Sequence, residues 1–464
     1  MLKIFLTEVY LPSAYCCFLE TSYRKGGNEM ENLADYKKES IRLFGVGVEL
    51  IYIETLVDAN KTKQQLLAWS EEAVLPDEDA FAVGSLLLER IDGQLVNGEP
   101  VDPLLAGQAF LSFPDWTQRV QFTPQTKQLD RSLSESQTQS VVRGTQVAFT
   151  EALDTNIGLL RKQLPSPKLA YRTITLGTDT KRKAGLLYLE GNADPKLVAD
   201  VWQALEQRKS KDHPTTQSIF HTLQQKWWNP FPTIFSTDVP QEAARMLREG
   251  RVLLIVDQFP SALITPGVLQ DAFYLAEDRG YPNIITHFLR LLRILAMFIA
   301  LTAPALYVGL IAVNPEVLRI QLALSIAQSR EGVPYPALVE VLLMLLVIEL
   351  VLEASVRLPK SIGPTVTMVG GIVLGQAVVQ AHLVSNLLII VISAMTLANF
   401  SIIGFQTSLA VRIFKYALLV ITSIYGLIGL FIGLVWVIAF ISGLTTFGVP
   451  YLSRWKEQQE GSHG

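Results

Sequence analysis

A series of apolar spans in the last third of the chain, residues 288–448, constrains the fold more than any other feature of the sequence. The first span, 291–313, has 23 residues and a single charged side chain, Arg293, close to its start. A helix of this length rises by about 34 Å, enough to cross the ~30 Å hydrocarbon core of a bilayer. The last span, 416–441, has 26 residues and no charged side chain. These spans predict an all-α, multi-span membrane domain.

The charges divide the chain into two parts. Of the 39 Lys+Arg and 43 Asp+Glu residues, residues 287–464 hold 10 basic and 7 acidic ones, which leaves 29 basic and 36 acidic ones in residues 1–286. The front part is thus a charged, mildly acidic region, long enough to build one large core or two smaller ones. This balance argues against a nucleic-acid partner, which requires a basic surface.

The first twenty residues are apolar but do not read as a signal peptide. They contain Lys3, Glu8 and Pro12, and they lack a long apolar core and a small-residue cleavage site. We therefore expect the large N-terminal region to stay in the cytoplasm, with Met30 as an alternative start. The adjacent pair Cys16 and Cys17 predicts neither a disulfide framework nor a metal site.

An internal repeat lies in the soluble part. Residues 50–58 (LIYIETLVD) resemble residues 186–194 (LLYLEGNAD) at an offset of 136. Each is a β-rich run that ends in an Asp suited to cap a helix, predicted over 59–72 and 195–208. Pro195 occupies the first helical turn, where proline is tolerated.

A second pair of segments continues the repeat. Residues 84–92 resemble residues 250–257 with a one-residue slip. Two strand–helix–strand units in the same order predict two related α/β subdomains. The alternative interpretation is chance similarity between short Leu/Ile strands.

The fold class predicted is therefore an α/β soluble region of two related subdomains followed by the membrane domain. The predicted order is an N-terminal extension (1–39), the first α/β subdomain (40–116), a polar linker (117–140), the second α/β subdomain (141–280), the membrane domain with four or five spans (281–452) and a short polar tail (453–464). The linker is rich in Gln, Ser and Thr, which is typical of loops.

Two shorter patterns lie within the second subdomain. Residues 146–164 predict a helix with one apolar face, formed by Phe149, Leu153, Ile157, Leu160 and Leu164. Trp227 and Trp228 allow two interpretations: anchors at a membrane interface, or members of a packed aromatic cluster. The second is at least as well supported, because about 60 residues separate the pair from the first span.

The second apolar stretch, 337–356, carries three acidic side chains: Glu340, Glu349 and Glu353. Carboxylates at membrane depth are unfavourable and usually functional, so all three are candidates for an ion path. Glu340 lies on the helical face opposite Glu349. For Glu353 the alternative is a simple i,i+4 ion pair with Arg357 near the interface.

The third stretch, 362–384, is rich in small residues. Gly371 and Gly375 form a GxxxG pair, and Gly429 and Gly433 form another in the last span. We predict close helix packing at both, with a gating hinge as the minor alternative. The same stretch carries two glutamines and a histidine: Gln376, Gln380 and His382. The glutamines share a face that either lines an ion path or hydrogen-bonds another helix, and the histidine predicts an interhelical hydrogen bond.

The topology follows from the positions of the basic residues. Arg290 and Arg293 place the start of the first span on the cytoplasmic side. Five spans put six basic residues inside and four outside, whereas four spans reverse the ratio, so the positive-inside rule favours five. A four-span topology remains an alternative, because the second stretch is acidic and can be re-entrant instead of spanning the membrane. After residue 314, a helix with Gln321, Ser325 and Gln328 on one face is predicted to be interfacial or re-entrant.

Several short motifs are spread over the chain, among them 325–327, 330–336, 357–360 and 447–452 in the membrane part. In sequence and in order, these motifs resemble the A subunit of GerA-type spore germination receptors. Through this resemblance a set of motif or interface residues is implied: Arg143, Gly144, Glu151, Asn156, Arg161, Arg330, Glu331, Pro334 and Pro336. The family implies a membrane receptor in the inner spore membrane that senses small nutrient germinants, oligomerises and releases ions. Its implied partners are a B-type integral membrane subunit and a C-type lipoprotein.

The chain departs from the family pattern at four positions. Thr145 stands in place of the usual proline, and Gln258 in place of the usual glycine. In the second apolar stretch, Leu345 and Leu352 replace a common Glu and Arg, seven residues apart. The joint loss of two opposite charges is electrostatically self-consistent.

No sequence pattern of an enzyme is present. The chain has no P-loop, no dinucleotide fingerprint, no nucleophile elbow and no HExxH or CxxC motif, and no cofactor is predicted. The favoured function is a receptor or channel subunit. One alternative is a secondary transporter, with a substrate site built from 314–336 and 362–375; such a protein should show inverted repeats in its membrane half. A third is a membrane scaffold without conduction.

Overall fold

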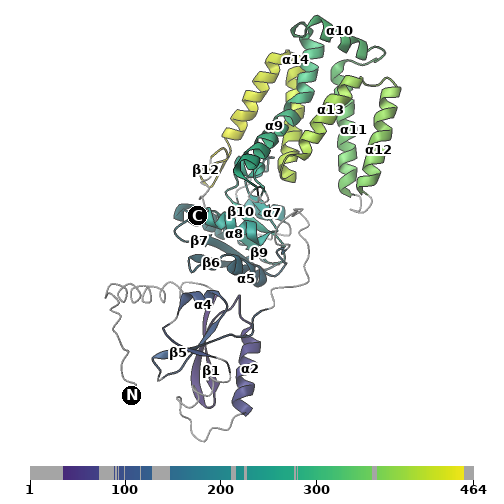
Figure 1. Cartoon of the computed structure of the whole chain (residues 1–464). Helices are drawn as coiled ribbons and strands as arrows, with labels where there is room; N and C mark the ends of the chain where they lie inside the picture. The colour runs from purple at the N-terminus through teal and green to yellow at the C-terminus, as the bar shows by residue number, and fades with distance from the viewer. Residues whose placement is uncertain are drawn as a thin grey trace, which may run out of the picture. The chain divides into compact units, whose positions relative to one another are not determined.

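The computed structural model describes residues 35–72, 88, 91, 93–98, 100–114, 116–127, 147–210, 216–223, 227–275, 278, 281–357 and 363–453. The chain forms two compact units (Figure 1). We call them the α/β unit, with the described parts of 1–224 and 234–266, and the helical unit, with those of 225–233 and 267–455. The described residues of 225–233 and 267–280 thus belong to the helical unit, although the sequence analysis predicted them in the second α/β subdomain.

The first half of the α/β unit is a five-stranded antiparallel sheet with the order β1-β2-β4-β5-β3. Its elements are β1 (Tyr36–Leu43), β2 (Val46–Ile53), α2 (Ala59–Glu72), β3 (Gln94–Asn97), α4 (Val101–Leu105), β4 (Ala109–Ser112) and β5 (Gln118–Phe122). The apolar residues of β2 and β4, among them Leu50, Ile51 and Phe110, are fully buried and form the core of this half. Asp58 caps α2 by accepting a hydrogen bond from the Lys61 backbone N–H.

The second half repeats this architecture with the order β6-β7-β9-β10-β8, again antiparallel throughout. Its elements are α5 (Leu153–Gln163), β6 (Leu169–Leu176), β7 (Arg182–Leu189), α6 (Pro195–Gln207), α7 (Thr216–Thr222), β8 (Phe235–Thr237), α8 (Pro240–Arg248), β9 (Val252–Val256) and β10 (Ala262–Thr265). Asp194 caps α6 by accepting a hydrogen bond from the Lys196 N–H at 2.9 Å.

The two sheets match strand for strand, so the prediction of two related α/β subdomains is confirmed. The offset of 136 residues holds for β2 and β7 and for the starts of α2 and α6. The second pair of repeat segments was wrong, however. By sheet order the counterpart of β9 is β4, not residues 84–92, of which Leu88 is helical and Ile91 lies in a turn.

Two predicted boundaries also differ from the structure. β1 begins at Tyr36, four residues before the predicted start of the first subdomain. β5 occupies 118–122, at the beginning of the predicted polar linker, because Val120 and Phe122 alternate into the core. The helix predicted over 146–164 begins only at Leu153, although its five apolar side chains are all buried in one cluster.

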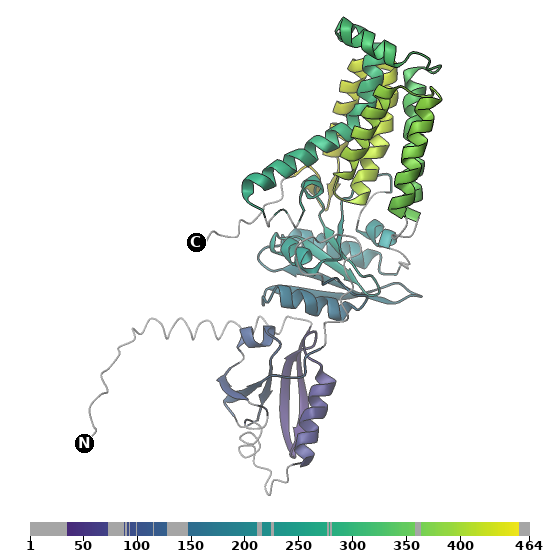
Figure 2. The same cartoon turned by 45° about the vertical axis from the view of Figure 1, so that its right-hand side comes forward.

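The helical unit contains α9 (Asn283–Val308), a π-helical turn η3 (Gly309–Val313), α10 (Ile320–Ser329), α11 (Ala337–Arg357), α12 (Gly363–Gln380), α13 (Asn386–Phe400) and α14 (Phe405–Ser442). Among the described helices, α9 with η3 and α14 are long and apolar enough to cross a membrane. Figure 2 shows that α9 is bent; Pro304 lies inside it and leaves one helical hydrogen bond unmade.

Helix α14 is a hairpin of two antiparallel arms, 405–425 and 427–442. Gly426 between them has φ 63° and ψ −146°, which no helix contains. The ring centroids of Phe414 and Trp436 are 5.4 Å apart, whereas residues 22 apart in a continuous helix are separated by about 33 Å. The interpretation of 416–441 as one straight span was therefore wrong.

The hairpin returns the chain to the end of the unit where α9 begins. After α14 the chain forms the short ladder β11 (Thr445–Thr446) with β12 (Val449–Pro450). The Tyr451 carbonyl then accepts a hydrogen bond from the Leu269 N–H at 2.9 Å, ahead of α9. Both ends of the helical unit thus lie close together, whereas five spans would place them on opposite sides of a bilayer; the number of spans stays a prediction.

The break at Gly426 is closed by a side chain from the end of α9. The Asn314 Oδ1 accepts a hydrogen bond from the Leu427 N–H at 2.9 Å. A Cβ atom on residue 426 would lie 2.0 Å from that oxygen, so the position requires glycine for space as well as for its positive φ. At the same end of the unit, α10 has no buried residue, and Gln321, Ser325 and Gln328 are all exposed.

Candidate functional site: charged side chains among the membrane helices

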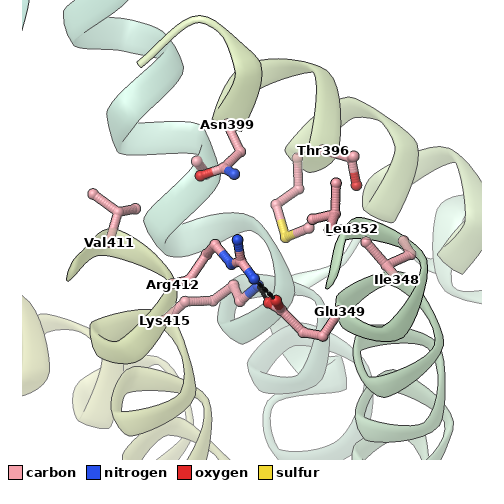
Figure 3. A pocket seen from close by; sticks show the side chains of 10 residues that line it. Ile348, Glu349, Leu352, Thr396, Asn399, Val411, Arg412 and Lys415 are labelled. Atoms are coloured by element: carbon pink, nitrogen blue, oxygen red, sulfur yellow. Dashed lines mark hydrogen bonds and ion pairs between the residues drawn. The ribbon is translucent and has the colours of Figure 1, made fainter. Parts of the chain in front are cut away.

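Glu349 of α11 forms a charged cluster with two cations of α14 (Figure 3). Its Oε2 forms an ion pair with the Arg412 guanidinium, and its Oε1 lies 3.4 Å from the Lys415 Nζ. Lys415 is only 4% exposed, and the other two side chains are about one-fifth exposed. Arg412 and Lys415 are three residues apart and therefore lie on the same face of their helix, toward α11.

The cluster borders a small cavity of about 10 Å³, close to the size that one water molecule needs. Its lining comes from four helices: Ala300, Ile348, Glu349, Leu352, Met395, Thr396, Asn399, Val411, Arg412 and Lys415. One carboxylate between two cations leaves a net positive charge, which would repel a passing cation. Glu349 thus connects α11 to α14 through two ion pairs, and its part in an ion path stays a prediction.

Glu340 forms a second and separate cluster at the start of α11. Its side chain is fully buried, and its Oε1 accepts a hydrogen bond of 2.6 Å from the Ser385 N–H, where α13 begins. Its Oε2 lies 3.4 Å from the Arg330 Nε. The Ser385 Oγ in turn lies 2.9 Å from the Tyr307 hydroxyl of α9. Glu340 thereby connects α9, α11 and α13 with the loop before α11.

Glu353, at the end of α11, pairs with Arg357 of the same helix at 2.6 Å. Both side chains are mostly exposed. This is the local i,i+4 pair that the sequence offered as the alternative to an ion path.

Gln376 and Gln380 are exposed on α12, and neither lines the cavity beside Glu349. A Cβ atom added at Gly371 or Gly375 would meet no described atom within 4 Å. The face of α12 that bears this glycine pair is therefore open in the single chain, and its packing role stays a prediction.

The second glycine pair has close neighbours. A Cβ at Gly429 would lie 2.6 Å from the Ile421 carbonyl oxygen, and one at Gly433 would lie 2.9 Å from Leu418. Both neighbours belong to the opposite arm of α14. These glycines thus allow the two arms of the hairpin to approach each other closely. His382, the lone histidine of this region, is exposed and has a positive φ of 53°.

Arg330, Glu331, Pro334 and Pro336 form the loop between α10 and α11. Besides its contact with Glu340, Arg330 donates a hydrogen bond from Nη2 to the Tyr335 carbonyl at 3.3 Å. Glu331, Pro334 and Pro336 are exposed. Arg330 thus fixes a loop whose other motif side chains remain available at the surface.

Arg161 and Asn156, both fully buried, are structural in this fold. Arg161 donates from Nε and Nη2 to the two Asp35 carboxylate oxygens, at 3.0 and 2.7 Å. Asn156 accepts the Thr150 N–H at 2.8 Å and thereby orders the chain before α5. Glu151 is exposed, while Arg143 and Gly144 lie outside the described residues.

Three of the four departures from the family pattern lie in the part of the chain that the structure describes, and Thr145 lies outside it. Gln258 has a φ of 68°, a conformation that the usual glycine adopts without strain. Leu345 is fully buried in an apolar cluster, and Leu352 lines the cavity beside Glu349. Leucine at these two positions therefore keeps the inner face of α11 apolar around its remaining carboxylates.

The start of α9 is fixed by arginines. Arg293 donates to the Phe273 carbonyl at 3.0 Å and to both oxygens of Asp278, with Nη2 to Oδ1 at 2.8 Å. Arg290 stacks on the Tyr274 ring at 3.6 Å. Burial alone would raise the pKa of Asp278, but its hydrogen bonds to Arg293 and the Leu275 N–H outweigh this and hold the pKa below its usual range.

Sequence reasoning missed the partners of these carboxylates. It treated Arg412 and Lys415 as charges of an inner loop and did not single out Ser385 or Tyr307. The available signal was the spacing of Arg412 and Lys415, one helical turn apart beside an uncharged span. Among the described residues, no group of three or more His, Cys, Asp or Glu side chains is arranged to hold a metal.

A duplicated antiparallel α/β unit followed by apolar helices long enough to cross a bilayer is typical of a membrane-associated protein. Residues 27–462 match the family described as Bacillus/Clostridium GerA spore germination protein. The chain belongs to this family, as its sequence motifs predicted.

Similar proteins share most of their length with this chain. Spore germination protein A1 of Bacillus subtilis (strain 168) is 30% identical over 421 residues, covering 90% of this chain and 86% of that protein. Spore germination protein KA of the same organism is 32% identical over 444 residues, covering 91% and 81%. The N-terminal domain of the A subunit of the Bacillus megaterium spore germinant receptor GerK3 is similar over 54% of this chain and 95% of that chain, with 22% identity and a TM-score of 0.39.

Proposed function

We propose that this chain is the membrane subunit of a nutrient-germinant receptor, and that it oligomerises to form or gate the path by which ions leave the spore. One observation carries the proposal: α12 exposes Gln376 and Gln380 on a helix whose glycine pair also has no neighbour. Amide groups facing hydrocarbon are unfavourable, so these side chains need water or another subunit. Oligomerisation through α12 would place these side chains against another subunit or in a water-filled path between subunits.

In this proposal the acidic residues of α11 stabilise the helices around the ion path and do not line the path themselves. The pairing of Glu349 with two cations suits an ionic cross-link between α11 and α14, which opens or shifts when the receptor is activated. Glu340 fixes the starts of α11 and α13 in the same way. The uncharged oxygens of Gln376 and Gln380 are the better ligands for a passing cation.

Membership in the family supports a proposal for the partners and the compartment. We propose that the chain works with a B-type integral membrane subunit and a C-type lipoprotein in the inner spore membrane. The α/β unit lies on the cytoplasmic side in this scheme, because Arg290 and Arg293 flank the start of α9. In the described residues, both ends of the helical unit then lie on that side.

The test compares glutamine variants in spores. Gln376→Leu and Gln380→Leu should slow cation release or change its ion preference after germinant is added, at normal levels of the protein. Gln321→Leu on α10 is the matched control, because it removes an equally exposed amide outside α12. Unchanged release in both α12 variants, with the response to germinant intact, would favour the non-conducting scaffold instead.

Assembly has its own test. Gly375→Leu should lower the size of the purified complex, because a branched side chain prevents close approach at that face. Gly370→Leu is the control, since its Cβ also has open space but points about 100° away around the helix. An unchanged complex size for both variants argues against assembly through this face.

A further inference from the structure

The loop that carries Trp227 and Trp228 exposes a large aromatic surface. Trp227 is 85% exposed and Trp228 is 48% exposed. A tryptophan side chain in water leaves a large apolar area unburied, and folded proteins rarely leave one so exposed without a partner. The surroundings of the loop indicate what the partner is.

The loop is held against the end of α14, within the helical unit. Phe231 is 2% exposed and stacks on Phe414, with the ring centroids 5.4 Å apart. Trp228 meets Phe440 edge-on, at 5.8 Å and 72°. The Asn229 side chain fixes the turn by accepting the Phe231 N–H at 3.0 Å. The loop therefore has a defined position relative to the last turn of α14.

The loop therefore lies at the same level along the axis of α14 as the end of that helix. On the second arm of α14, Phe431, Val435 and Ile438 are 60–67% exposed and form one apolar stripe. The arm ends at Ser442, immediately after Phe440, and the chain then turns into β11. An exposed apolar stripe that stops where the helix stops is typical of the boundary between hydrocarbon and head groups.

We propose that Trp227 and Trp228 form a membrane anchor, in which both side chains bind the boundary between the head groups and the acyl chains of phospholipids. Tryptophan prefers this boundary because its ring is apolar and its indole N–H remains hydrogen-bonded. The anchor joins a segment that precedes the first span by about 60 residues to the membrane surface beside α14. It requires membrane association but no conduction, so it stands apart from the proposed ion path.

Fluorescence quenching tests the proposal in the full chain, reconstituted into vesicles of phosphatidylcholine and phosphatidylglycerol. Trp227→Phe removes one fluorophore, so the difference from the unchanged chain isolates the emission of Trp227. We expect that emission to be quenched by lipids brominated near the head-group end of their acyl chains. Lipids brominated near the methyl end should quench it less, and aqueous iodide should quench it least.

Trp202→Phe is the matched control, since Trp202 lies on α6 in the α/β unit and is partly exposed. Its difference emission should respond to iodide and not to brominated lipid. Trp227 emission quenched by iodide alone would overturn the anchor and leave a solvated loop. Emission of Trp227 that no quencher reaches would also overturn it, because another protein surface would then cover the side chain. Equal denaturation midpoints for the variants and the unchanged chain exclude misfolding as the cause.

Discussion

The two ends of helix α11 carry the same side chain in opposite settings. At its start, Glu340 is fully buried and joins the Ser385 N–H of α13 to Arg330 of the preceding loop. At its end, Glu353 is mostly exposed and pairs only with Arg357 of its own helix. The contribution of a carboxylate to this fold thus depends on how many elements it connects and on how much water reaches it. Glu349 lies between these extremes in position and in exposure.

The largest effect is expected at the buried end. Glu340→Ala should lower the free energy of unfolding in detergent by about 3–5 kcal/mol, because it leaves Arg330 without its neighbouring carboxylate and the Ser385 N–H without its acceptor. Glu340→Gln is the control, since it keeps an oxygen for the Ser385 N–H and should cost less. Equal losses for the two variants would show that the hydrogen bond to Ser385 contributes little.

A smaller loss is expected in the middle of the helix. Glu349→Ala should cost about 2–3 kcal/mol, less than a fully buried pair, because about one-fifth of the Glu349 side chain is exposed. Lys415, which is 4% exposed, then has no counter-ion. Adding Lys415→Met should recover part of the loss, and the same denaturation measurement checks it. A further loss in the double variant would contradict the role of Lys415 as the destabilising charge.

A third carboxylate, Asp278 ahead of α9, makes the stability of the helical unit depend on pH. The folded pKa of Asp278 is depressed below its unfolded value near 3.8, so its interactions stabilise the fold above that pH. Their contribution is lost as the pH falls through the folded pKa. We therefore expect the helical unit to lose stability below about pH 4, and Asp278→Asn to flatten this part of the profile. A denaturation series between neutral and acid pH measures both, and identical profiles would refute the assignment.

The smallest effect is expected at the exposed end of α11. Glu353→Gln should change the free energy of unfolding by about 0.5 kcal/mol or less, because exposed i,i+4 pairs contribute little. A loss comparable to that of Glu349→Ala would mean that Glu353 meets a partner outside the single chain. The same denaturation measurement, repeated on the assembled complex, shows whether that partner belongs to another subunit.

Local patterns in the sequence predicted what depends on local structure. The apolar runs and capping residues of 50–72 and 186–208 predicted matching strand–helix pairs, because such signals lie within a few residues of each other. The Glu353–Arg357 pair, one helical turn apart, was visible for the same reason. The strand equivalent to β9 was misassigned because β4 is only four residues long and follows a region without a clear period.

Long-range contacts explain what the sequence could not predict. The Glu349–Arg412 pair joins residues 63 positions apart, and Asn314 reaches a break more than 110 residues later. Gly426 is one of several glycines in an uncharged apolar run, and nothing local distinguishes its positive φ from the helical conformation of Gly429. Only the packing between the arms shows that the run contains two helices.

The hairpin of α14 also bears on how the protein is made. Two apolar arms joined at Gly426 can enter the bilayer together, so no polar segment that follows them has to be carried through the hydrocarbon. A reporter fused after Tyr451 should therefore emerge in the same compartment as the segment that precedes α9, to which Tyr451 is hydrogen-bonded. Insertion of the two arms as one unit would leave both ends of the helical unit on the same side of the bilayer.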